Sequence, residues 1–308
     1  MPAMTEFWRS LLRNATEFDP QSRPLAFGRF LLALATLSSV VFTSDAELFS
    51  DATAASGGIR CDGLRSLSLW CLNSDLTGTY TLARILTLTV LILVATGYRP
   101  KWTCIPHWYV TFSLAASMSA TNGGDSAAVI ATMLLVPLCL GDGRRWQWSR
   151  PSRPLPARWR GRSYAAQLVI RLQLVVIYLS AAGSKLLDPA WRDGSAMYFA
   201  LHDPYSGLPA SVLDSVAPLL DSRWLVGLVT WAVIATQVVI AVTVLGRRRE
   251  RMLAVVLVAG LHLGIIVLMG LTSFGIIMIG FALLALGGRS HHTRKEAGVD
   301  HDAARQPV

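Results

Sequence analysis

Residues 163–185 read SYAAQLVIRLQLVVIYLSAAGSK, and this stretch decides the kind of fold to expect. Only two of its residues, Arg171 and Lys185, are charged, and most of the others are apolar. A helix needs about 20 consecutive apolar residues to cross the roughly 30 Å of hydrocarbon in a bilayer. The stretch therefore predicts a membrane-spanning helix, which Pro189 prevents from continuing.

The rest of the chain has the same character, with 53% hydrophobic and 15% charged residues among 308. A soluble protein of this length would need far more polar surface. We therefore predict an all-α fold, a polytopic membrane helix bundle of about eight transmembrane helices. The runs long enough to span are 24–43, 79–97, 163–185, 224–245 and 252–269, and the shorter ones are 107–121, 126–141 and 274–288.

Basic residues are distributed unevenly between the two ends of these eight segments. One end carries 20 of the 28 Lys and Arg residues, and the other carries four basic residues with 11 of the 19 acidic ones. Cytoplasmic loops are enriched in Lys and Arg, so this pattern predicts a multi-pass protein of the bacterial cell membrane with both termini cytoplasmic. The basic residues are explained by topology and by contact of 142–162 with anionic lipid headgroups, so no nucleic-acid partner is expected.

Three regions are expected along the chain. Residues 1–23 are predicted to form a cytoplasmic interfacial amphipathic helix, because 6–18 place apolar side chains on one helical face beside two arginines. Residues 24–288 form the transmembrane domain, and 289–308 a disordered cytoplasmic tail. The segments 44–78 and 186–223 are the large outer loops, and each is too short for an independent domain.

The four cysteines separate by position. Cys61 and Cys71 share the first outer loop, in an oxidising compartment, which favours a disulfide over two free thiols. Cys104 and Cys139 fall near the cytoplasmic ends of two spans. The chain has no CxxC motif and its histidines are scattered in depth, so no metal site is expected.

Cations without acidic neighbours lie inside the predicted spans: Arg29, Arg84, Arg171 and Lys185. Such residues are costly in hydrocarbon and usually face a bundle interior or a functional site. Gln167, Arg171, Tyr178 and Lys185 fall on one helical stripe, which predicts a polar seam along 163–185.

Arg84, roughly 8 Å below the outer surface by helix rise, is at a depth to meet Lys185. We expect an anion or substrate pocket there, with Asp125 and Asp188 at its rim. Alternatively, Lys185 pairs locally with Asp188, or Lys185 and Arg29 extend to the nearby interfaces.

Two other polar residues, Gln237 and His262, lie within the spans. Gln237 is assigned to the same pocket as Arg84, Arg171 and Lys185, and His262 is either a packing residue or a functional one. The catalytic residues are unknown, and the candidates are Lys185, Tyr178 and His262. No Ser-His-Asp set, phosphate loop or carboxylate pair can be assembled from the spans.

Three segments carry a family resemblance. They are TNGGDSAAVIATMLLVPLCLGDGRRWQW (121–148), VIYLSAAGSKLLDPAWRDGSAMYFAL (176–201) and LHLGIIVLMGLTSF (261–274). Together they resemble the HTTM membrane domain group of vitamin K-dependent gamma-carboxylases and, within it, the SdpB-type sporulation-delaying proteins. The likeness covers about residues 24–288.

The resemblance implies a bacterial membrane factor that acts with a small SdpA-like partner in the maturation or export of a secreted, disulfide-containing antimicrobial peptide toxin. An alternative is a membrane enzyme that uses a lipid-soluble cofactor, whose identity is unknown. Carboxylation by the carboxylase mechanism is disfavoured, since Leu186 replaces the catalytic second lysine of that family and Asn122–Asp125 stands where its active-site histidine falls. Gln237 stands where related sequences have an acid. A transporter or immunity-type protein is a third alternative.

Overall fold

The structure is a computed structural model that describes residues 2–49, 59, 61–77, 80–151 and 154–290. Over these residues the fold is almost entirely helical, as predicted. The single sheet consists of two short strands, β1 (Phe18–Asp19) and β2 (Arg289–Ser290), paired antiparallel.

Each of the eight predicted apolar segments is a helix. Their bounds are α2 (Arg23–Phe42), α5 (Thr81–Thr96), α6 (Pro100–Ser117), α7 (Gly123–Cys139), α8 (Ala157–Leu187), α12 (Arg223–Thr243), α13 (Arg248–Met269) and α14 (Thr272–Ala285). In the described part of the chain, α2, α8, α12 and α13 are long and apolar enough to cross a membrane. Helix α6 begins seven residues before the predicted run because Pro100 fits the first turn of a helix.

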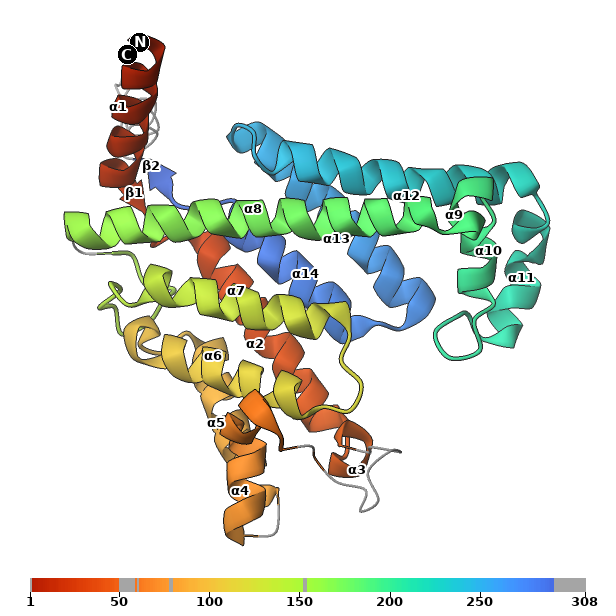
Figure 1. Cartoon of the computed structure of the whole chain (residues 1–308), viewed down its shortest axis with the longest axis horizontal. Helices are drawn as coiled ribbons and strands as arrows, with labels where there is room; N and C mark the ends of the chain where they lie inside the picture. Colours follow the sequence, from red (N-terminus) through yellow and green to blue (C-terminus); the bar gives the residue numbers. More distant parts are fainter. Residues whose placement is uncertain (1, 50–58, 60, 78–79, 152–153, 291–308) are drawn as a thin grey trace, which may run out of the picture.

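The core of the bundle lies between α2, α7, α8 and α14 (Figure 1). Helices α2 and α14 approach closely where Gly28 faces Gly280. A Cβ at Gly28 would lie 2.7 Å from the Gly280 carbonyl oxygen, so a larger residue there would push the helices apart. Small residues at helix crossings allow this kind of approach in membrane proteins.

Short helices fill the two predicted outer loops. The first contains α3 (Asp45–Leu48), a 3-10 helix η1 (Gly63–Leu67) and α4 (Leu69–Thr77). The second contains α9 (Pro189–Asp193), α10 (Ala196–Leu201) and α11 (Ala210–Leu220). Figure 1 shows α9, α10 and α11 gathered beyond the C-terminal end of α8.

The chain ends of the bundle meet in the two-stranded sheet. The expected interfacial helix corresponds to α1 (Pro2–Glu17), which extends away from the N-terminal end of α8 (Figure 1). The first two residues of the predicted disordered tail form β2 instead, because their backbone pairs with Phe18 and Asp19. The remainder of that tail, 291–308, lies outside the described residues.

Candidate functional site

The polar seam predicted on α8 exists, but the half nearer the N-terminus of α8 binds the end of another helix. Gln167 donates a hydrogen bond to the carbonyl of Leu284 at 2.7 Å, and Nε of Arg171 donates to that of Ala285 at 3.2 Å. These are among the last carbonyls of α14, where the regular pattern of helix hydrogen bonds ends, and that of Leu284 also accepts the Gly287 N–H at 3.2 Å. A cation at a helix C-terminus is also favoured by the helix dipole. Arg171 therefore caps α14.

The middle of the seam joins α8 to α13. The hydroxyl of Tyr178 lies 3.0 Å from Nε2 of His262, and both residues are buried. The ring of Phe274 in α14 packs against the imidazole at a centroid distance of 5.0 Å. Nδ1 of His262 has no hydrogen-bond partner in the described part of the structure. This contact brings two of the three catalytic candidates together.

At the C-terminal end of the seam, Lys185 meets neither Arg84 nor Asp188. Its ammonium donates to the Ala181 carbonyl at 3.4 Å and lies 4.9 Å from the centre of the Trp191 ring. Asp188 instead accepts the Ala190 N–H at 2.9 Å and caps α9. Because its carboxylate is used by the new helix, the predicted local pair of Lys185 and Asp188 does not form.

Arg84 does not join Lys185 in this structure. Its guanidinium forms an ion pair with Asp45 at 2.9 Å and donates to the Thr43 carbonyl at 2.7 Å. Helix α5, which carries Arg84, lies with α2, α4 and α6, well apart from the C-terminal end of α8 (Figure 1). This pairing is not predictable from the sequence, because Asp45 is 39 residues away in a loop whose path no local pattern specifies.

The other two members of the expected pocket are also separate. Asp125 belongs to a capping box at the start of α7, where it accepts the Asn122 N–H at 2.9 Å. Gln237 is buried on α12, and its Oε1 has no hydrogen-bond partner among the described residues. The predicted pocket residues are therefore distributed over several helix contacts.

Arg29 is fully buried, so it does not extend to the interface. It donates hydrogen bonds to Oε1 of Gln147 at 2.8 Å and to the hydroxyl of Thr103 at 2.6 Å. These bonds join α2 to α6 and to the segment that follows α7. The sequence signal that could have found this contact is the lone Gln147 within the arginine-rich loop.

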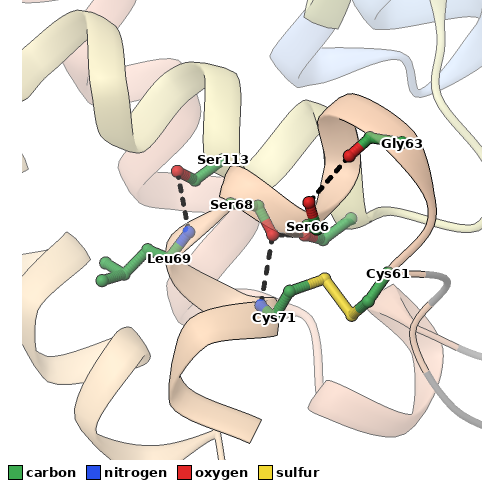
Figure 2. The surroundings of a disulfide bond; sticks show 8 residues. Cys61, Gly63, Ser66, Ser68, Leu69, Cys71 and Ser113 are labelled. Atoms are coloured by element: carbon green, nitrogen blue, oxygen red, sulfur yellow. Dashed lines mark hydrogen bonds between the residues drawn. A yellow bond between two sulfur atoms is a disulfide. The ribbon is translucent and has the colours of Figure 1, made fainter. Parts of the chain in front are cut away.

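The first of the two predicted outer loops contains a disulfide bond. Cys61 and Cys71 are bonded, with their Cα atoms 5.7 Å apart. Figure 2 shows this bond beside Ser68, whose hydroxyl accepts the Cys71 N–H at 3.1 Å. The backbone of Leu69 donates to the Ser113 hydroxyl of α6, which attaches the segment to the bundle (Figure 2).

The second of the two predicted outer loops borders a cavity of about 270 Å³. It lies between the turn after α9 and the start of α12, and it is lined by Asp193, Gly194, Ser195, Tyr198, Leu220, Asp221, Arg223 and Val226. Hydrogen bonds from the Ser195 hydroxyl and N–H lower the pKa of Asp193, so this carboxylate is ionised at neutral pH. No cluster of metal-binding side chains is present within the part of the chain that the structure describes.

In the part of the chain that the structure describes, four long apolar helices and buried polar contacts between helices are the features of a helical membrane protein. It is 30% identical over 286 residues to uncharacterized protein YitO of Bacillus subtilis (strain 168), covering 92% of this chain and 91% of YitO. It is also 30% identical over 270 residues to sporulation-delaying protein SdpB of the same organism, covering 87% of this chain and 82% of SdpB. The chain belongs to the SdpB family. No family model and no solved structure matches it.

Proposed function

We propose that this protein is a membrane factor for the maturation or export of a secreted antimicrobial peptide toxin. The observation that carries the proposal is the similarity to sporulation-delaying protein SdpB along most of both chains. The proposal includes a relationship to the HTTM group, which is supported by the motifs at 121–148, 176–201 and 261–274. An SdpA-like small protein and a toxin precursor are the proposed partners.

The proposed topology has eight spans, with both termini cytoplasmic, in a bacterial cell membrane. The pairing of β1 with β2 supports an even number of crossings, because it joins the two ends of the helical region. Reporter fusions test this directly. A fluorescent protein fused after Ser149 should fluoresce, and alkaline phosphatase fused after Ser206 should be active. The reverse pattern would contradict the topology.

The outer end of α8 is the proposed contact for an acidic segment of the precursor. Lys185 lies there without a carboxylate partner in the described structure, and its ammonium rests on the Trp191 ring. Lys185→Gln should reduce toxin output, whereas Arg192→Gln, which removes an exposed cation seven residues away, should not. Equal output from both variants would remove Lys185 from the proposed contact.

A gene deletion tests the function as a whole. Culture supernatants of the wild type, the deletion strain and a complemented strain should be compared by intact-mass spectrometry of small disulfide-containing peptides. We expect the deletion to abolish the mature toxin while the precursor is still secreted, and complementation to restore the toxin. Unchanged mature toxin in the deletion strain would refute the proposal. Copurification of a small partner with the tagged protein tests the SdpA-like subunit.

A second candidate function is a membrane enzyme that acts with a lipid-soluble cofactor. The buried contact between Tyr178 and His262 favours it, because a phenol and an imidazole 3.0 Å apart can exchange a proton. Tyr178→Phe keeps the ring and removes this possibility. If the variant folds with an unchanged melting temperature but yields no toxin, the enzyme is supported. Normal toxin output would instead make the contact a structural one.

A further inference from the structure

A second cavity lies at the arginine-rich end of the bundle, away from the seam on α8. It has a volume of about 160 Å³ and lies between the turn that joins α5 to α6 and the segment that follows α7. It is lined by Arg99, Lys101, Trp102, Asp142, Gly143, Arg144 and Arg145. Four of these residues are cationic and one is anionic, so the lining carries three excess positive charges.

Asp142 is the only carboxylate among the lining residues, and it already has partners within the chain. Asp142 forms an ion pair with Arg144 at 2.7 Å and accepts a hydrogen bond from Nε2 of Gln21 at 2.8 Å. Arg99, Lys101 and Arg145 form no ion pair with any described carboxylate. Three cations around one small space repel each other, and an anion from outside the chain would neutralise them.

The backbone holds both walls of the cavity in place. The Arg99 N–H donates to the Arg145 carbonyl at 2.8 Å, and Tyr98 pairs with Trp146 in an isolated β-bridge. The Gln147 N–H donates to the Gly97 carbonyl at 2.9 Å. Arg99 has a left-handed backbone, with φ of 37°, which a side chain adopts only where its surroundings enforce it. The cationic side chains therefore project from a preformed frame.

That frame also contributes a helix terminus. Helix α6 begins at Pro100, so the positive end of its dipole lies at the cavity, although Pro100 has no N–H and those of Trp102 and Thr103 already donate to the Arg99 carbonyl. Phosphate groups bind readily at such positions. The volume is below the roughly 300–1,000 Å³ of pockets that enclose a whole organic ligand, so it suits a single anionic group.

We propose that this cavity binds the phosphate of an anionic phospholipid headgroup. The lipid source is indicated by the aromatic residues around it. Trp102, which lines the cavity, is 66% exposed, and Trp146 and Trp148 are 40% and 42% exposed. Tryptophans of this kind occupy the headgroup level of membrane proteins, where a lipid phosphate would also lie. A polybasic surface attracts anionic lipids without selecting a position for them, whereas this cavity would bind a single headgroup at a defined position.

The first test places a carboxylate in the cavity. A Cβ at Gly143 would meet nothing within 4 Å, so Gly143→Asp adds negative charge without a clash. Gly161→Asp is the matched control, because a Cβ there also meets nothing within 4 Å and Gly161 does not line the cavity. The full chain in detergent is titrated with phosphatidylglycerol or phosphatidylcholine, and bound lipid is counted by native mass spectrometry. We expect phosphatidylglycerol to be preferred, and Gly143→Asp alone to weaken its binding about tenfold or more.

A second pair of variants keeps the test decisive if Gly143→Asp does not fold. Lys101→Gln with Arg145→Gln removes two lining cations, and Arg248→Gln with Arg249→Gln removes two exposed cations elsewhere at the same end. Only the first pair should lose phosphatidylglycerol. Equal loss in both pairs would show a diffuse charge effect and overturn the site. Saturable binding of inorganic phosphate alone, lost in the first pair, would overturn the lipid assignment.

Discussion

Replacing Gln147 with leucine should destabilise the protein more than replacing the buried arginine that it binds. Arg29 is fully buried, and the amide oxygen of Gln147 accepts one of its hydrogen bonds at 2.8 Å. Gln147→Leu removes that acceptor and leaves the positive charge in place. Arg29→Met removes the charge and leaves two neutral groups, Gln147 and Thr103, with fewer bonds.

The magnitudes follow from this asymmetry. A hydrogen bond to a charged group contributes about 1.5–3 kcal/mol, and removing one partner of a buried ion pair costs about 3–5 kcal/mol, which is an upper range for the neutral partner Gln147. We therefore expect Gln147→Leu to lower the free energy of unfolding by about 3 kcal/mol. For Arg29→Met we expect about 1 kcal/mol, the lower end of the cost of leaving a buried neutral acceptor without its donor. At about 2 °C per kcal/mol for a large domain, the melting temperature should fall by about 6 °C and about 2 °C, respectively.

The two buried thiols of Cys104 and Cys139 provide the assay. They are 1% and 2% exposed and close to Arg29, so a thiol-reactive fluorophore reports when this part of the core opens on heating. The double variant Arg29→Met with Gln147→Leu should be more stable than Gln147→Leu alone, because no buried charge remains. A larger loss for Arg29→Met than for Gln147→Leu, with no recovery in the double variant, would refute the electrostatic reasoning.

Three further predictions concern the outer segments. Replacing Cys61 and Cys71 with serine opens a loop with a sequence separation of 10, and the unfolded chain gains entropy that lowers the stability by about 3 kcal/mol. Amide hydrogen exchange in 61–77 should therefore accelerate strongly, and unchanged exchange would contradict this. Arg84→Met should lower the free energy of unfolding by less than about 1 kcal/mol, because the side chains of Arg84 and Asp45 are 25% and 38% exposed. A fall of several degrees in melting temperature would show that the ion pair is effectively buried. Hydrogen bonds from Ser195 lower the pKa of Asp193, so the ionised carboxylate stabilises its turn above about pH 4. This stabilisation is lost when the carboxylate is protonated, as the pH falls through the lowered pKa. Exchange of the 194–195 amides, corrected for intrinsic rates, should therefore rise as the pH falls from about 5 to 3, and a flat profile would contradict this.

The sequence by itself predicted the helical class and the positions of the eight apolar helices. Both follow from local composition: a long run of apolar residues satisfies its own backbone hydrogen bonds only as a helix in lipid. The polar stripe on α8 was also predictable, because residues seven apart share a helical face. For the same reason the sequence predicts that Tyr178 and Lys185 lie on one seam.

Only the tertiary structure decided what each of these polar residues meets. Arg84 pairs with Asp45, Arg171 with the end of α14 and Arg29 with Gln147. These partners are between 39 and 118 residues away, on elements whose mutual packing no local pattern specifies. A buried cation must be hydrogen-bonded, and its acceptor is the polar group that helix packing places next to it. The role of the cation therefore depends on contacts between helices, which local sequence does not encode.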